Sequence, residues 1–126
     1  MSDSERQERG QSIIQQLQGG TDKDEIFSLI EEVFPDFLKV VTEEQIFGDV
    51  WSRPGLALRE RAMIVMAVLI AFRFTDELKA HMRYALNIGL SQEEILEVIM
   101  QVAPYTCWGC GVGATRLAGE VFSAKE

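Results

Sequence analysis

Apolar residues recur along this chain at the three- and four-residue spacing of helices, and no stretch alternates with the two-residue period of a strand. This spacing predicts a first helix over residues 4–18, which ends at Gly19-Gly20 because glycine readily takes the left-handed conformation. A second helix is expected to start at Asp22 or Asp24. It is expected to end before Pro35, which lacks a backbone donor.

The middle of the chain contains the most apolar segment. A third helix is expected over 36–45, followed by a loop over 48–56, where tryptophan, proline and glycine occur together. The next helix, over 58–74, is apolar nearly all round, and such a helix must be covered on every side. Self-association is the simplest cover, so the pattern favours an oligomer.

The remainder of the chain is predicted to form three further helices. Thr75 or Asp76 is expected to cap the first of them, which ends at Gly89. The segment Ser91-Gln92-Glu93-Glu94 has the sequence of a capping box and opens the second. The last helix is expected over 111–124. The chain is therefore predicted to be an all-α bundle of about six to seven helices.

Length and composition indicate one globular domain over residues 1–126, with a partly frayed helix over 1–20. Hydrophobic residues make up 47% of the 126 positions and charged residues 25%, an ordinary globular mixture. The net charge of −8 opposes binding to nucleic acid or to an anionic membrane, because both need a cationic patch. The longest apolar run, over 62–72, is shorter than the roughly 20 residues of a spanning helix.

The termini and cysteines bear on location. The N-terminal residues have neither the apolar block of a signal peptide nor the acid-poor character of a transit peptide. Two cysteines cannot supply the disulfide framework of a small secreted protein and fit a reducing compartment. We therefore expect a cytoplasmic protein.

His81 is the only histidine and the first candidate for chemistry, since its side chain exchanges protons near neutral pH. Glu77 lies four residues earlier on the same helical face, where a carboxylate can hold the imidazole tautomer. In an acidic protein, basic residues near this helix are candidate clamps for an anionic substrate: Lys79, Arg83, Arg53, Arg59 and Arg61. The alternative is a surface histidine in an ordinary ion pair with Glu77.

Cys107 and Cys110 have the two-residue spacing of a redox dithiol, although two buried, inert thiols are an equal alternative. A structural zinc site is not expected, because it needs four ligands and the chain offers two cysteines and one histidine. Glu60 is either a buried acid or a first-turn residue favoured by the helix dipole. Trp51 and Trp108 either line a pocket or cover the core.

Several segments together resemble the carboxymuconolactone decarboxylase family, which includes the alkylhydroperoxidase D-like (AhpD-like) proteins. The likeness covers nearly the whole chain and is clearest from Phe47 to Phe122. The segments that carry it are Gly48-Asp49-Val50-Trp51-Ser52-Arg53-Pro54-Gly55-Leu56, Arg59-Glu60-Arg61, Glu77-Leu78-Lys79-Ala80-His81-Met82-Arg83-Tyr84-Ala85-Leu86-Asn87-Ile88-Gly89, Ser91-Gln92-Glu93-Glu94-Ile95-Leu96-Glu97-Val98 and Ala103-Pro104-Tyr105.

This resemblance implies an AhpD-like helical subunit in a homo-oligomer, commonly a hexamer built as a trimer of dimers. It also implies a lyase that needs no cofactor, a decarboxylase of a small anionic lactone or keto acid whose own carbonyl accepts the electrons. His81 would be the proton donor and Glu77 its orienter. Arg53 and Arg83 would be the clamps. The resemblance adds two pocket residues, Glu60 and Tyr105.

Two features separate this chain from parts of the family. Peroxidase-linked members carry Cys-x-x-Cys four residues before the histidine, where this chain has Phe74 and Glu77. After the tyrosine, decarboxylases usually carry a Gly-x-Pro stretch of small residues, whereas this chain has residues 106–113 with Trp108 and both thiols. The alternatives to a decarboxylase are a thiol-disulfide oxidoreductase or peroxidase-linked reductase using Cys107 and Cys110, and a non-catalytic oligomeric binding protein.

Overall fold

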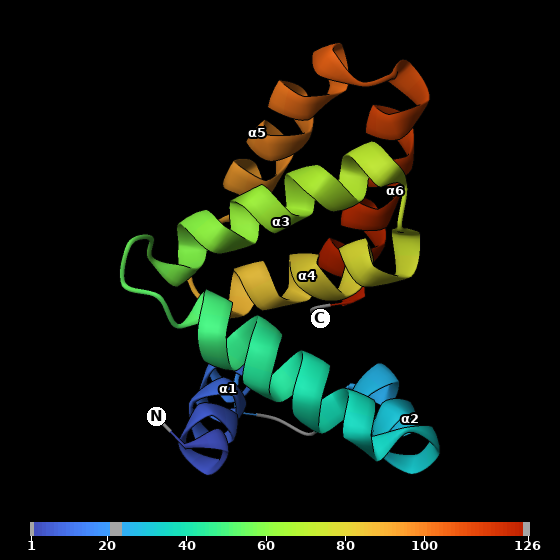
Figure 1. Ribbon diagram of the computed structural model, residues 1–126. Coiled ribbons are helices and arrows are strands. Elements are labelled where there is room, and N and C mark those ends of the chain that lie inside the picture. Colours follow the sequence, from blue (N-terminus) through green and yellow to red (C-terminus); the bar gives the residue numbers. More distant parts are fainter. Residues whose placement is uncertain (1, 21–23, 125–126) are drawn as a thin grey trace. The chain divides into compact units, whose positions relative to one another are not determined.

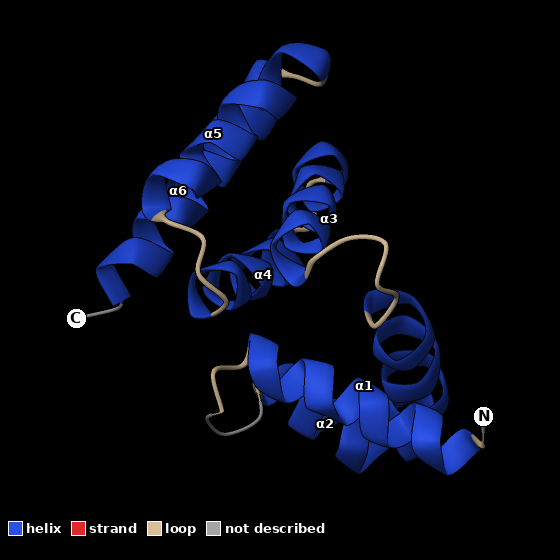
Figure 2. Ribbon diagram, turned by 90° about the vertical axis from the view of Figure 1, so that its left-hand side faces the viewer, coloured by secondary structure: helices blue, strands red, loops and turns tan. Residues whose placement is uncertain are grey.

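The chain consists of helices joined by short connections. The computed structural model describes residues 2–20 and 24–124, and within these ranges every regular element is a helix (Figure 2). The all-α prediction is thereby confirmed. The chain divides into two compact units, Met1–Ala57 and Leu58–Glu126. The single domain expected over residues 1–126 stays a prediction.

The first unit is built on the packing of its first helix, α1 (Asp3–Leu17), against a π-helix, η1 (Phe37–Trp51). A Cβ atom at Gly10 would lie 1.8 Å from the backbone oxygen of Glu43, and one at Gly48 would lie 2.4 Å from that of Arg6. Only glycine therefore allows the two backbones to approach this closely.

The middle of the first unit differs from the sequence prediction. The helix expected to end near residue 45 continues as η1 to Trp51, so the loop expected to start at Gly48 starts at Ser52 instead. Gly48 is a contact residue of a helix and not a turn residue. The second helix, α2 (Glu25–Val33), follows Asp24, whose side chain makes no capping hydrogen bond. Asp22, the other predicted start, lies outside the described residues.

The second unit contains four α-helices and one 3₁₀ turn. They are α3 (Leu58–Phe72), α4 (Thr75–Asn87), α5 (Gln92–Val102), η2 (Ala103–Tyr105) and α6 (Trp108–Ala124). Helix α3 packs on α4 and α5, and α6 also packs on both of these (Figure 1). The side chains at the centre of this unit are fully buried and apolar: Met66, Ile70, Met82, Ile95 and Val121.

The ends of these helices decide three predictions. Ser91 and Glu94 form the expected capping box at the start of α5, and Gly89 takes a positive φ of 107° after α4. Neither Thr75 nor Asp76 caps α4, because Phe74 occupies the N-cap position. The last helix starts at Trp108 and not at residue 111, since its first turn includes most of the cysteine segment.

Helix α3 ends in a conformation that glycine usually supplies. Arg73 has φ of 60°, and its N–H donates to the backbone oxygen of Ile70 at 3.2 Å. The N–H of Phe74 donates to the oxygen of Leu69 at 3.0 Å, which completes a Schellman-type ending. A side chain at this left-handed position costs about 1 kcal/mol. The backbone at Arg73 is therefore strained, and this strain comes with an arginine side chain at the end of α3.

No helix of the described ranges combines the length and apolar character that a bilayer crossing requires.

Candidate functional site

His81 lies in the middle of α4 and is half-buried. Its ring meets the ring of Tyr84 edge-on, with centroids 5.1 Å apart and planes at 71°. Tyr84 is itself buried, with 5% of its surface exposed. An edge-on aromatic contact restricts the rotation of the imidazole. The histidine is therefore held against the core of the second unit while part of it still reaches solvent.

The residues predicted to assist His81 on α4 take different positions. Glu77 is exposed one turn earlier, and no hydrogen bond joins it to His81 in the described part of the chain. Arg83 is half-buried and two residues further on. Positions two apart on a helix do not face each other, so α4 does not bring Arg83 and His81 to one face. The roles of Glu77 as orienter and Arg83 as clamp stay predictions.

Glu60 belongs to a charged cluster at the start of α3. The Nε atom of Arg59 lies 3.7 Å from Glu60, and the Arg59 guanidinium also pairs with Glu94 of α5. Glu60 is half-buried and lies in the first turn of α3, as the second of its two sequence interpretations held. The Ser91 backbone N–H and the Arg59 guanidinium, both bonded to the Glu94 carboxylate, lower the pKa of that group. The cluster ties the first turns of α3 and α5 together.

This coupling predicts a pH dependence of stability. Because the folded pKa of Glu94 lies below its ordinary value of 4.5, its stabilisation is present above pH 4.5 and is lost as pH falls through the depressed value. We expect Glu94→Gln to lower the urea midpoint at neutral pH. The difference from the parent protein should shrink as pH falls below 4.5. A difference that stays constant with pH would show that the Glu94 charge contributes nothing.

Two predicted site residues lie in the first unit. Trp51 is 6% exposed and packs on Phe47, with ring centroids 5.4 Å apart. Trp51 therefore belongs to the core of that unit, as the second of its sequence interpretations held. Arg53 is exposed in the loop that follows η1. Its role as a carboxylate clamp stays a prediction.

The aromatic residues near the cysteines are prominent on the surface of the second unit. Tyr105 ends η2 with 83% of its surface exposed, and Trp108 opens α6 with 84% exposed. Neither side chain covers the core of its own unit. Both are free to contact a ligand or another chain.

Cys107 and Cys110 form a disulfide, with Cα atoms 5.1 Å apart. Cys107 is exposed and precedes the first residue of α6, whereas Cys110 is 7% exposed inside its first turn. The interpretation of two buried, inert thiols therefore does not hold, because Cys107 is exposed and both sulfurs are joined in a disulfide. Of the residues that the structure describes, no three histidine, cysteine, aspartate or glutamate side chains gather as a metal site would require.

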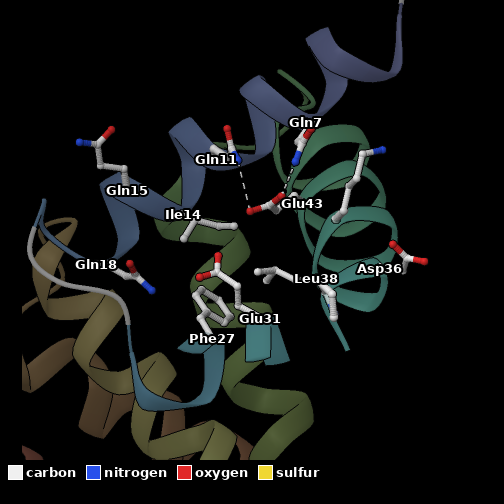
Figure 3. A pocket seen from close by; sticks show the side chains of 12 residues that line it. Gln7, Gln11, Ile14, Gln15, Gln18, Phe27, Glu31, Asp36, Leu38 and Glu43 are labelled. Atoms are coloured by element: carbon white, nitrogen blue, oxygen red, sulfur yellow. Dashed lines mark hydrogen bonds between the residues drawn. The ribbon is translucent and has the colours of Figure 1, made fainter. Parts of the chain in front are cut away.

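A cavity of about 540 Å³ in the first unit was not foreseen from the sequence (Figure 3). Glu43, which is 7% exposed, projects toward it and accepts hydrogen bonds from the side-chain amides of Gln7 at 2.8 Å and Gln11 at 3.4 Å. Gln15 and Gln18 continue the same wall. The signal in the sequence is the spacing of these glutamines, which places three amides along one side of α1 and the fourth, Gln18, at its C-cap.

Comparison with known proteins shows to which family this chain belongs. The sequence profile of the carboxymuconolactone decarboxylase family matches residues 35–119. The chain belongs to the carboxymuconolactone decarboxylase family. It is 30% identical over 122 residues to the 4-carboxymuconolactone decarboxylase of Acinetobacter baylyi, an alignment covering 97% of this chain and 90% of that protein. The resemblance predicted from the sequence is thereby confirmed.

A second relative of this family member has a different named substrate. The chain is 36% identical over 62 residues to the nitrosuccinic acid decarboxylase of Metarhizium robertsii, covering 49% of this chain and 43% of that protein. Both relatives carry the name of a decarboxylase. They support the prediction that this chain is an enzyme of the carboxy-lyase type.

Proposed function

We propose that this family member is a cofactor-free decarboxylase of a small anionic lactone or keto acid that resembles carboxymuconolactone. The observation that carries the proposal is the similarity to a 4-carboxymuconolactone decarboxylase along 97% of the chain. In such a substrate a carbonyl group conjugated with the breaking bond accepts the electrons left by carbon dioxide. The protein then has to bind a carboxylate, stabilise charge on the carbonyl oxygen and return a proton to carbon.

His81 is the proposed proton donor. Its half-buried imidazole beside Tyr84 is restrained and still accessible, as a general acid needs to be. Glu77 is proposed to raise the basicity of the imidazole when substrate is bound. Glu60 is proposed as a further acid of the pocket, and it lies beside Arg59 at the start of α3.

Substrate binding is assigned to residues that can hold an anion or cover its ring. Arg53 and Arg83 are the proposed carboxylate clamps, since a guanidinium binds a carboxylate through two parallel hydrogen bonds. Tyr105 and Trp108 have the exposed aromatic surface that could cover a bound lactone. Trp51 is proposed only as a support, because it is buried among the core residues of the first unit.

The direct test is carbon dioxide release from 4-carboxymuconolactone, with nitrosuccinate as the second substrate. We expect turnover of at least one anionic substrate of this class without added metal or coenzyme. The variant with both Cys107→Ser and Cys110→Ser should retain most of this activity, because the proposed chemistry uses no thiol. No turnover of either compound by the parent protein, or a double variant without activity, would remove the proposal and favour binding or thiol chemistry.

We further propose that the enzyme is a homo-oligomer, a hexamer built as a trimer of dimers. The family resemblance supports this assembly. Helix α3 supports it too, because three of its apolar side chains remain largely exposed in the chain: Ile64 at 52%, Val68 at 46% and Phe72 at 66%. Light scattering coupled to size-exclusion chromatography measures the mass of the assembly. A stable monomer would contradict the proposal.

A further inference from the structure

We propose that Cys107 and Cys110 form a second reactive site, which exchanges its disulfide with small thiols that carry a carboxylate. This activity is separate from the proposed decarboxylation and does not depend on it. It rests on three observations: the two cysteines differ in exposure, the Cys107 sulfur accepts a hydrogen bond, and two arginines lie beside Cys110.

The two sulfurs differ in what can reach them. Cys107 is exposed, so an incoming thiolate can approach its sulfur, whereas Cys110 is 7% exposed inside α6. Trp108 stands between them in sequence but is 84% exposed, and thus does not cover the pair. Thiol exchange requires access to one sulfur and a leaving group on the other. The geometry points to attack at Cys107, with Cys110 leaving.

The start of α6 stabilises a negative charge on Cys107. The backbone N–H of Cys110 donates a hydrogen bond to the Cys107 sulfur at 2.9 Å. The same N–H groups at a helix N-terminus favour a thiolate over a thiol. When the disulfide is reduced, Cys107 is therefore the better nucleophile and the better leaving group in exchange with an external disulfide.

Two arginines lie next to this disulfide. Arg73 and Arg116 line a cavity of about 130 Å³ together with Cys110. A Cβ atom at Gly109, inside the cysteine segment, would lie 3.8 Å from both terminal nitrogens of Arg73. Neither arginine has an ion pair within residues 2–20 and 24–124.

The surroundings leave these cations available for a ligand. Glu120, four residues after Arg116 on α6, is paired with Lys79 at 2.9 Å. Arg73 is placed by the strained left-handed ending of α3. In a protein of net charge −8, two unpaired guanidinium groups beside a disulfide select an anionic partner.

The exchange balances in two steps. A thiolate R–S⁻ attacks the Cys107 sulfur, forms R–S–S–Cys107 and releases the Cys110 thiolate, which takes the proton that the first thiol lost. A second R–S⁻ attacks the R sulfur of the mixed disulfide and releases R–S–S–R with the Cys107 thiolate, which is protonated in turn. Two thiols are oxidised to one disulfide, and the protein disulfide gains two electrons.

The first experiment measures how fast 3-mercaptopropionate and 2-mercaptoethanol reduce the disulfide of the full chain, by alkylation and mass spectrometry. The two arginines lie beside Cys110, whose thiolate leaves, so the variant combining Arg73→Gly with Arg116→Ala should slow both thiols, and the anionic one about fivefold more than the neutral one. Comparing each thiol with itself removes its intrinsic reactivity. Arg73→Gly relieves the left-handed backbone strain, so loss of folding does not explain the effect.

The variant combining Arg73→Lys with Arg116→Lys is the matched control, because it keeps both charges and should retain most of the preference. An equal effect on both thiols, or no effect on either, overturns the anion selection. Failure of both thiols to reduce the folded parent protein overturns the exchange itself.

A second experiment tests which of the two sulfurs an external partner can reach. Each single variant leaves one cysteine that can form a mixed disulfide with glutathione disulfide. Cys107 in the Cys110→Ser variant should react at least about tenfold faster than Cys110 in the Cys107→Ser variant. The reason is that the sulfur of Cys107 is accessible, whereas that of Cys110 is not. Equal rates would overturn the assignment of Cys107 as the sulfur that external partners reach. Thermal unfolding of both variants checks that each is folded.

Discussion

Replacing His81 with alanine is expected to lower the turnover number of the decarboxylase by roughly 10²–10⁴-fold, the usual contribution of a positioned general acid. The loss arises because the carbanion formed after carbon dioxide leaves has no nearby proton donor. The Michaelis constant should change little, since Arg53 and Arg83, the proposed carboxylate clamps, are untouched. Carbon dioxide release at saturating substrate measures the effect.

The control for this variant separates chemistry from folding. His81 packs on Tyr84, so the alanine variant loses an aromatic contact as well as a proton donor. Tyr84→Leu removes the same contact and keeps the imidazole, and it should retain far more activity. Glu77→Gln should shift the pH dependence of turnover without abolishing it, as expected of an orienter. Unaltered turnover in His81→Ala would remove the acid/base assignment.

The sequence predicted the helices best where a local signal sets each end. The side chains of Ser91 and Glu94 bond to each other's backbone N–H, and Gly89 takes a positive φ after α4. Both features depend only on residues close in sequence, and both were predicted correctly. The start of α4 was missed because Phe74 takes the N-cap position where Thr75 or Asp76 was expected. Nothing in the local sequence favours phenylalanine there.

The π-helix η1 shows why local turn residues can mislead. In a π-helix each hydrogen bond reaches one residue further along the chain than in an α-helix. The buried residues of η1 are Leu38, Thr42, Glu43, Glu44, Phe47, Gly48 and Trp51. The glycine, tryptophan and proline residues between positions 48 and 56 predict a loop, and the last turn of this helix was therefore assigned to that loop. The close contact of Gly48 with α1 is a tertiary feature, and its own sequence neighbours do not reveal it.

The candidate site was predictable in residue type more than in arrangement. The helical spacing correctly placed Glu77 one turn before His81, and it could not show whether their side chains bond. The cysteine spacing left a reactive pair and two inert thiols equally open. The unequal exposure of Cys107 and Cys110, together with Arg73 from a distant turn, depends on how α3 meets α6 and was invisible in the sequence.

Gly10→Ala is expected to lower the free energy of unfolding of the first unit by about 4 kcal/mol or more. Losses of this size are found only where a substitution creates a severe clash or a large cavity. The added Cβ would lie 1.8 Å from the backbone oxygen of Glu43, and a backbone atom cannot turn aside as a side chain can. Helix α1 would have to move away from η1. That movement would also pull Gln7 and Gln11 from the buried Glu43 carboxylate, leaving a charge without its donors.

Hydrogen exchange of the α1 amides measures this loss in the unit concerned, because it reports local opening. Gly119→Ala is the matched control: a Cβ there meets nothing within 4 Å, and the residue lies inside α6. Alanine is favoured over glycine in a helix interior, so this control should gain about 0.5–1 kcal/mol. If both variants protect their amides as well as the parent protein does, the glycine contact between α1 and η1 does not hold the first unit together.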